Sequence, residues 1–138
     1  MKLAVAILAA LVCLIAIQAQ QPSRSTRDGV YTDDQAKRGE AIYNQACAKC
    51  HGDQLTGGES APPLAGGDFQ SNWNGLTVGD LFERIRISMP ADRVGSLTNA
   101  QNADVIAHIL RSNQFPSGKT ELDRQADVLK QIKFEPLR

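Results

Sequence analysis

The sequence has little of what a small domain normally uses to build its core. Aromatic residues make up 5% of its 138 residues, and it contains three cysteines and two methionines. A chain of this length is expected to form one domain with a marginal core, and small scaffolds usually add disulfides, a metal or another staple. We therefore expect a bound group to supply the apolar mass that the side chains lack.

An excess of charge of either sign is also missing. Lysine plus arginine and aspartate plus glutamate number 15 each, which gives a formal net charge of zero. No strong electrostatic field therefore selects nucleic acid or anionic lipid as a partner. The sequence shows no internal repeat and no alternating strand pattern, so the fold class that it favours is all-α.

Long apolar runs are absent except at the N-terminus. Met1–Lys2 is a short basic start, Leu3–Ile17 is apolar, and Ala19 offers a small residue for cleavage. The apolar run is shorter than the roughly 20 residues that cross a bilayer. We expect residues 1–19 to be a signal peptide, so that the mature protein is periplasmic or otherwise extracytoplasmic without stable membrane insertion; a retained anchor is the alternative. The polar residues 20–29 are expected to form a flexible leader.

Three helices carry start signals in the sequence. Thr32–Gln35 and Thr98–Gln101 are capping boxes, and Thr77 with Asp80 indicates a further helix N-terminus. Pro90 is expected to end this middle helix, because proline cannot continue the hydrogen-bond ladder. Gly39 lies inside the first helix, where it costs about 1 kcal/mol relative to alanine. We take this cost to indicate that another helix crosses there at close range.

The remaining segments have weaker patterns. Gly52–Gly75 is rich in glycine and proline and predicts a long irregular loop, which in a compact domain is usually functional. On the last helix, His108 shares a stripe with polar residues, so we expect it to face solvent. The core domain is expected to cover residues 30–118. Residues 119–138 are expected to form a tail with a short amphipathic helix.

Cys47-Ala48-Lys49-Cys50-His51 is the motif that carries chemistry. Two thiols one helical turn apart can add across the two vinyl groups of a haem edge, and the adjacent imidazole can reach the iron from the same side. The motif predicts one haem c per chain, bound covalently through Cys47 and Cys50, with His51 as an iron ligand. The alternatives are a disulfide or redox dithiol and half of a zinc site, although the mature chain offers only His108 as a further cysteine or histidine.

A second axial iron ligand is expected from Met89, the only methionine after the initiator. Met89 immediately precedes Pro90, at the start of a loop that could fold its thioether over the macrocycle. A soft, neutral thioether favours ferrous iron and raises the reduction potential. The alternative for Met89 is packing in a core gap, and His108 is the rival ligand.

Two further residues are candidates for contacts around the haem. A ligating imidazole usually donates its other ring nitrogen to a carbonyl group, and the Pro62 carbonyl is a candidate acceptor. A rigid loop corner without this role is the equally open alternative for Pro62. We expect Trp73 to pack in the core, with a bond from its indole N–H to a haem propionate as the alternative.

With Cys47–His51, Pro62–Leu64 and Met89–Pro90 in this order, the sequence resembles a class I, mono-haem cytochrome c over roughly residues 30–115. The resemblance implies a small fold of helices around one covalently attached haem, whose first and last core helices cross through a glycine and an aromatic residue. It also implies that the Pro62 carbonyl meets the proximal histidine, that Met89 is the axial methionine, and that the haem is attached outside the cytoplasm.

The resemblance can be followed on the two crossing helices. On the first helix, Gly39 and Tyr43 match the glycine and the aromatic residue. On the last helix, His108 stands near the place where relatives commonly carry an aromatic residue. Three short stretches are also similar to cytochrome c units found with pyrroloquinoline-quinone alcohol and sugar dehydrogenases: Gly29–Tyr31, Asn72–Gly75 and Gly79–Phe82.

These patterns predict an electron-transport protein that is not an enzyme by itself. Single electrons would pass while both axial ligands stay bound, and no substrate would be transformed at the metal. The expected partners are redox proteins, such as a quinoprotein dehydrogenase or a terminal oxidase, and no nucleic acid. The alternative is a haem enzyme or gas sensor with an open iron site, which would require Met89 to be a core filler.

Overall fold

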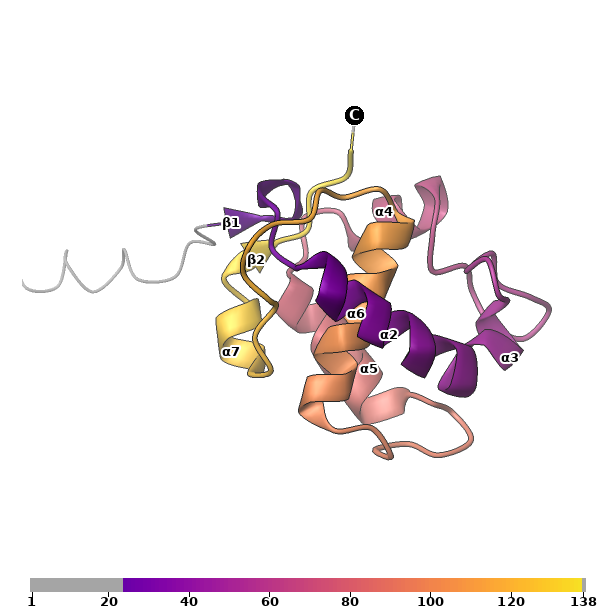
Figure 1. The fold of residues 1–138 in the computed structure, drawn as a ribbon. Coiled ribbons are helices and arrows are strands. Elements are labelled where there is room, and N and C mark those ends of the chain that lie inside the picture. Colours follow the sequence, from indigo (N-terminus) through magenta and orange to yellow (C-terminus); the bar gives the residue numbers. More distant parts are fainter. Residues whose placement is uncertain (1–23, 138) are drawn as a thin grey trace, which may run out of the picture.

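The computed structural model describes residues 24–137, and the expected signal peptide lies outside the described residues. In chain order, the elements are β1 (Arg24–Ser25), the 3-10 helix η2 (Thr26–Asp28), α2 (Asp33–Ala46), α3 (Ala48–His51), α4 (Gly67–Trp73), α5 (Val78–Ser88), α6 (Asn99–Ser112), α7 (Ala126–Leu129) and β2 (Ile132–Lys133). Figure 1 shows α2 and α6 crossing at the centre, with α3 on one side and the β1–β2 pair on the opposite side. Within residues 24–137, the regular elements are helices apart from one short parallel strand pair, which confirms the predicted fold class.

No helix within residues 24–137 combines the length and the apolar character needed to span a bilayer.

The three predicted helix starts are confirmed. Thr77 and Asp80 form a reciprocal capping box at the start of α5, and Thr98 and Gln101 form another at the start of α6. At the start of α2, the Thr32 hydroxyl accepts from the amide of Gln35. The Gln35 side chain does not return this bond, contrary to the prediction of a capping box.

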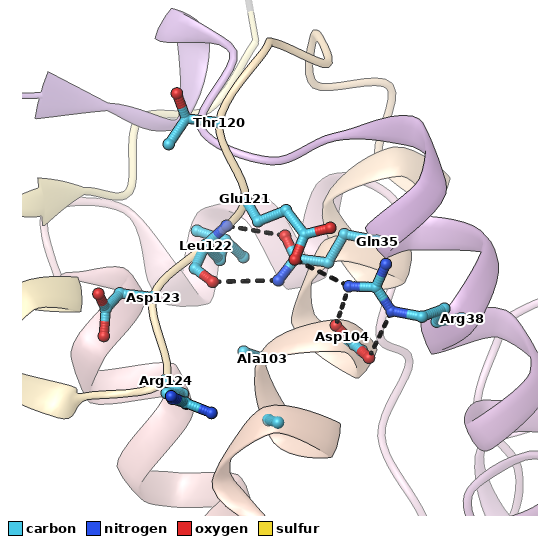
Figure 2. Close-up of a pocket in the computed structure, with 10 residues that line it drawn as sticks. Gln35, Arg38, Ala103, Asp104, Thr120, Glu121, Leu122, Asp123 and Arg124 are labelled. Carbon is cyan, nitrogen blue, oxygen red and sulfur yellow. Dashed lines mark hydrogen bonds and ion pairs between the residues drawn. The ribbon is translucent and has the colours of Figure 1, made fainter.

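The Gln35 side chain instead fixes a distant segment. Its Nε2 donates to the Leu122 carbonyl at 3.1 Å, and the Leu122 amide donates to its Oε1 at 2.7 Å. Figure 2 shows this pair beside Arg38, which bonds both Asp104 and Glu121 at the edge of a groove of about 440 Å³. The segment after α6 is therefore tied to α2 through the backbone of Leu122 and the side chain of Glu121, and Arg38 also links α2 to α6.

Gly39 brings α2 and α6 into backbone contact, as the sequence predicts. A Cβ atom at Gly39 would overlap the Asp104 carbonyl of α6. Any side chain larger than hydrogen would therefore push the two helices apart. Close packing here gives the two helices a shared core, which includes Ala36, Tyr43, Ile106 and Leu110, each essentially fully buried.

His108 is buried, so the prediction that it faces solvent is wrong. Its residue exposure is 6%, and its ring centroid lies 5.1 Å from that of Tyr43 on α2. The close approach at Gly39 brings α2 over this side of α6. The imidazole of His108 then packs at the helix crossing, near the position where relatives commonly carry an aromatic residue. Nη2 of Arg111 lies 3.4 Å from Nδ1 of His108 and 2.7 Å from the Glu40 carboxylate.

The two ends of the described chain pair with each other, which the sequence does not predict. Residues 24–28, which fall in the expected flexible leader, form β1 and η2. β1 runs parallel to β2 with Arg24 opposite Ile132, and the Thr26 hydroxyl bonds the backbone of Glu135. These partners are separated by more than 100 residues, so no local sequence pattern reveals them.

The tail packs on the domain through a shorter helix than its apolar spacing suggests. α7 has four residues and lies against α5 at Gly79, where a Cβ atom would meet the Lys130 amide at 2.6 Å. Phe134 then inserts its fully buried ring between Phe69 and Phe115, at centroid distances of 5.8 and 5.3 Å. The tail therefore contributes core to the domain.

α4 is a second element that the sequence does not predict, because it lies inside the expected irregular loop. Its Phe69 is buried, and Trp73 packs on Phe69 with ring centroids 6.2 Å apart. Glycine and proline flank the helix on the N-terminal side and obscure its short apolar pattern.

The burial of His108 predicts a pH-dependent stability. Burial, and then the Arg111 charge, lower the pKa of His108 below its ordinary value of 6.5, while Glu40 opposes the shift. Protonation therefore favours the unfolded chain, and stability is lost as the pH falls below about 6.5. In His108→Phe, which keeps a ring beside Tyr43, we expect a smaller loss of unfolding free energy between pH 7 and pH 5.

Guanidinium denaturation of both proteins at the two pH values measures this difference. The two proteins differ at this one position, so the comparison isolates the titration of His108. An equal loss of stability in both proteins would contradict the assignment.

Candidate haem site

The two thiols and the imidazole lie on one turn, the thiol turn (Cys47–His51), which directly follows α2. Cys47 caps α2, and its carbonyl accepts from the amides of Cys50 and His51 at 3.1 and 3.0 Å. Both thiols are free; Cys47 is half-buried and Cys50 is exposed, while His51 is 7% exposed. The position of this turn is set directly by α2, and therefore by the crossing with α6.

The surroundings of the Cys47 thiol do not suit the chemistry of a redox dithiol. Burial, with a smaller contribution from Cys50, raises the pKa of Cys47 to about 11. Reactive cysteines of redox dithiols have lowered pKa values, because the thiolate is the nucleophile. Within residues 24–137, no group of three or more histidine, cysteine, aspartate or glutamate side chains is placed to hold a metal ion. The turn therefore resembles neither a reactive dithiol nor part of a larger zinc cluster.

The His51 ring is held in one orientation by Pro62. Nδ1 of His51 lies 2.8 Å from the Pro62 carbonyl oxygen. A carbonyl oxygen only accepts hydrogen bonds, so Nδ1 carries the proton and Nε2 keeps its lone pair. In the described part of the chain, the only fully buried side-chain N or O atom without a partner is Oδ1 of Asn102. Nε2 of His51 is not among the fully buried atoms without a partner, so it remains accessible as a ligand.

Gly57 allows the loop after His51 to fold back far enough for this bond. The Gly57 amide donates to the His51 carbonyl at 2.8 Å, and Gly57 has a φ of +77°. A Cβ atom at this position would lie 2.6 Å from the Pro63 nitrogen and 2.8 Å from the Pro62 carbonyl carbon. The approach of Pro62 to His51 therefore depends on glycine at position 57.

Asn113 is a site-supporting residue that the sequence reasoning missed. Its side chain is buried at the end of α6, where it accepts from the Gly66 amide at 3.0 Å and donates to the Leu64 carbonyl at 2.9 Å. These bonds hold the segment that follows Pro62 against α6. The only local signal is an asparagine at a helix C-terminus, which does not reveal a partner about 50 residues away.

Met89 comes from a different element. It caps the C-terminus of α5, where its amide donates to the Ile85 carbonyl at 2.8 Å, and its side chain is half-buried. In Figure 1, this end of α5 lies on the side of the domain away from the β1–β2 pair, as α3 does. The structure thus brings Cys47, Cys50, His51 and Pro62 together, while Met89 lies on another element, at the end of α5.

The donor chemistry of these residues fits haem c. Two free thiols on one turn suit thioether attachment, an imidazole with a free Nε2 suits iron, and a thioether is a suitable second axial donor. Half-buried apolar side chains also pack against the core, among them Leu64 and Ala65, which follow Pro62 in the chain, and Ile85, which lies four residues before Met89. An apolar macrocycle would cover such surface.

A small helical fold with a Cys-x-x-Cys-His turn and a carbonyl-bound histidine defines a class I cytochrome c. The comparisons with known families agree: the chain belongs to the family described as cytochrome c oxidase, cbb3-type, subunit III, which matches residues 34–109, more than half of its length. As a member of this class, the chain carries covalently bound haem c and serves in electron transfer.

A solved structure shows the same fold. A chain of the sulfane dehydrogenase SoxCD from Paracoccus pantotrophus is similar, with a TM-score of 0.52 and 21% sequence identity. The match covers 78% of this chain and 61% of that chain, so this protein spans about three fifths of the matched chain. No curated protein matches the sequence.

The dependence of Pro62 on Gly57 can be tested with a matched pair of variants. Gly57 and Gly95 have similar φ values of +77° and +75°, but a Cβ atom at Gly95 would have no neighbour within 4 Å. Both alanine variants incur a left-handed strain of roughly 1–2 kcal/mol. We expect Gly57→Ala to lose about 1–3 kcal/mol more unfolding free energy than Gly95→Ala, because of overpacking against Pro62.

Denaturation of the haem-loaded variants gives these free energies, and the NMR signal of the His51 Nδ1 proton reports on the bond to Pro62. Equal destabilisation with an unchanged proton signal in both variants would show that Gly57 is not needed for the approach.

Proposed function

We propose that this protein is a one-electron carrier whose haem is attached through Cys47 and Cys50, with His51 and Met89 as the axial ligands. The observation that carries the proposal is the 2.8 Å bond from His51 to Pro62, which leaves Nε2 free to bind iron. The Met89 assignment is supported by its position at the end of α5 and by its being the only methionine after the initiator. When bound, haem c supplies a one-electron couple.

The residues of the chain tune and protect this couple. Nδ1 of His51 donates to Pro62, which fixes the tautomer of the ring and increases its basicity as a ligand. The neutral thioether of Met89 raises the reduction potential relative to a second imidazole. With both axial positions filled, no site remains for a substrate at the metal, so we propose a carrier that is not an enzyme.

The cellular location and the domain boundaries that we propose are those that the sequence predicts. We propose that residues 1–19 are removed as a signal peptide during export to the periplasm or another extracytoplasmic space. We also propose that residues 30–118 are the cytochrome domain and residues 119–138 its tail. Support comes from the packing of Leu129, Ile132 and Phe134 into the core, which makes the tail part of the folded unit.

We propose a dehydrogenase as the electron donor. The short stretches that resemble cytochrome c units of quinoprotein dehydrogenases support this partner, and the fold is shared with a chain of a sulfane dehydrogenase. Of the five large hydrophobic residues that are exposed within residues 24–137, two, Ile87 and Val94, flank Met89 in sequence and offer apolar contacts for such a partner.

The variant Met89→Ala tests the axial assignment. We expect the haem to stay covalently attached, the methionine-to-iron charge-transfer band of the ferric protein to disappear, and the reduction potential to fall by at least about 0.1 V, within the roughly 0.8 V range that axial ligands span. Ile87→Ala is the control, because this side chain is 61% exposed and lies two residues away. It should retain the band.

Optical spectroscopy and potentiometry measure both effects. If Met89→Ala keeps the band and the potential of the wild type, the ligand assignment is wrong. If the wild-type ferrous protein binds carbon monoxide rapidly and lacks the band, the open-site alternative of a haem enzyme or gas sensor holds instead.

A further inference from the structure

The hydroxyl of Tyr43 makes a bond that the helix crossing does not require. Tyr43 lies on α2, four residues before Cys47, and is fully buried. Its hydroxyl donates to the carbonyl of Gly52 at 2.7 Å. Gly52 directly follows His51, so this single bond connects α2 to the first residue after the thiol turn.

The ring of Tyr43 is itself held in place. It packs on His108 of α6 with ring centroids 5.1 Å apart, next to the backbone contact at Gly39. The ring therefore has a packing role that phenylalanine could also fill, whereas the hydroxyl has a role that phenylalanine could not. Burial raises the pKa of Tyr43 to about 12, so the hydroxyl stays protonated and remains a donor at neutral pH.

The Gly52 carbonyl lies at the start of the loop that returns to Pro62. It also accepts from the Leu55 amide at 3.1 Å, and the His51 carbonyl next to it accepts from the Gly57 amide at 2.8 Å. Gly52 has a φ of +77°, in the left-handed region, so the chain turns sharply at this point. The Tyr43 bond fixes the direction in which the chain leaves His51.

We propose that Tyr43 is a positioning residue for the haem ligand His51. Its hydroxyl holds the Gly52 carbonyl, and this contact keeps the loop in the fold that brings Pro62 to Nδ1 of His51. The inference rests on the proposed ligation of the iron by His51. A looser loop weakens the bond to Pro62, makes the imidazole a poorer donor to ferric iron, and so raises the reduction potential.

The two tyrosines of the chain provide a matched experiment. Tyr31 is also buried and precedes the N-terminus of α2, at the opposite end of this helix from Cys47; its hydroxyl donates to the Phe115 carbonyl at 2.6 Å. Tyr43→Phe and Tyr31→Phe therefore each remove one buried hydroxyl that bonds a backbone carbonyl. Only the hydroxyl that Tyr43→Phe removes bonds the segment that directly follows His51.

The readouts are native-state amide exchange by NMR in the reduced, haem-loaded protein and the midpoint potential of each variant. In Tyr43→Phe, we expect the amides of Leu55 and Gly57 to exchange at least about tenfold faster than in the wild type. In Tyr31→Phe, they should change by less than about twofold. The potential should rise in Tyr43→Phe and stay at the wild-type value in Tyr31→Phe.

Faster loop exchange together with a raised potential, both specific to Tyr43→Phe, supports the inference. Unchanged loop exchange in this variant, equal changes in both variants, or faster exchange with an unaltered potential overturns it. The proposed ligation of the iron by His51 is tested separately, by the spectrum of the wild-type protein. A spectrum that excludes histidine as a ligand would overturn that proposal, whatever the exchange rates of the loop amides.

Discussion

The backbone contact between α2 and α6 at Gly39 is the constraint on which the rest of the structure depends. A Cβ atom at Gly39 would overlap the Asp104 carbonyl, so the backbones of the two helices are in direct contact at this point. The thiol turn is a direct continuation of α2, and the crossing therefore sets its position. The same approach explains why His108 is buried and pairs with Tyr43, since α2 covers the side of α6 from which the imidazole projects.

The site is supported from two directions that both depend on this crossing. From α2, Tyr43 reaches the residue after His51. From α6, Asn113 holds the segment that follows Pro62. Between these supports, the loop has a glycine at position 57, where the backbone passes too close to Pro62 for a side chain to fit. A fixed imidazole keeps its orientation when the charge of the site changes, which is the property that an electron carrier requires.

Much of this arrangement could be predicted from the sequence, because its signals are local. Capping residues such as Thr77 and Thr98 bond amides three residues away, and the cysteine spacing defines one turn. The cost of a glycine inside a helix also predicted the crossing at Gly39. These features need only neighbouring residues, so a single sequence contains them.

The features that the sequence did not reveal are long-range polar pairs and burial set by another element. The bonds from Gln35 to Leu122 and from Thr26 to Glu135 join segments about 90 to 110 residues apart and leave no periodic pattern. His108 has polar neighbours along α6, and only the approach of α2 decides that it is buried. Local patterns thus predict the helices, the thiol turn and Pro62 as a partner of His51, whereas the supporting bonds of Tyr43 and Asn113 are found only in the folded chain.

Intact-mass spectrometry of the exported, mature protein tests the central claim most directly. The account predicts a polypeptide mass increased by one haem that survives denaturation, with fragments that place the added mass on Cys47 and Cys50. A colourless protein of unmodified mass, with a disulfide between these two cysteines, would contradict it.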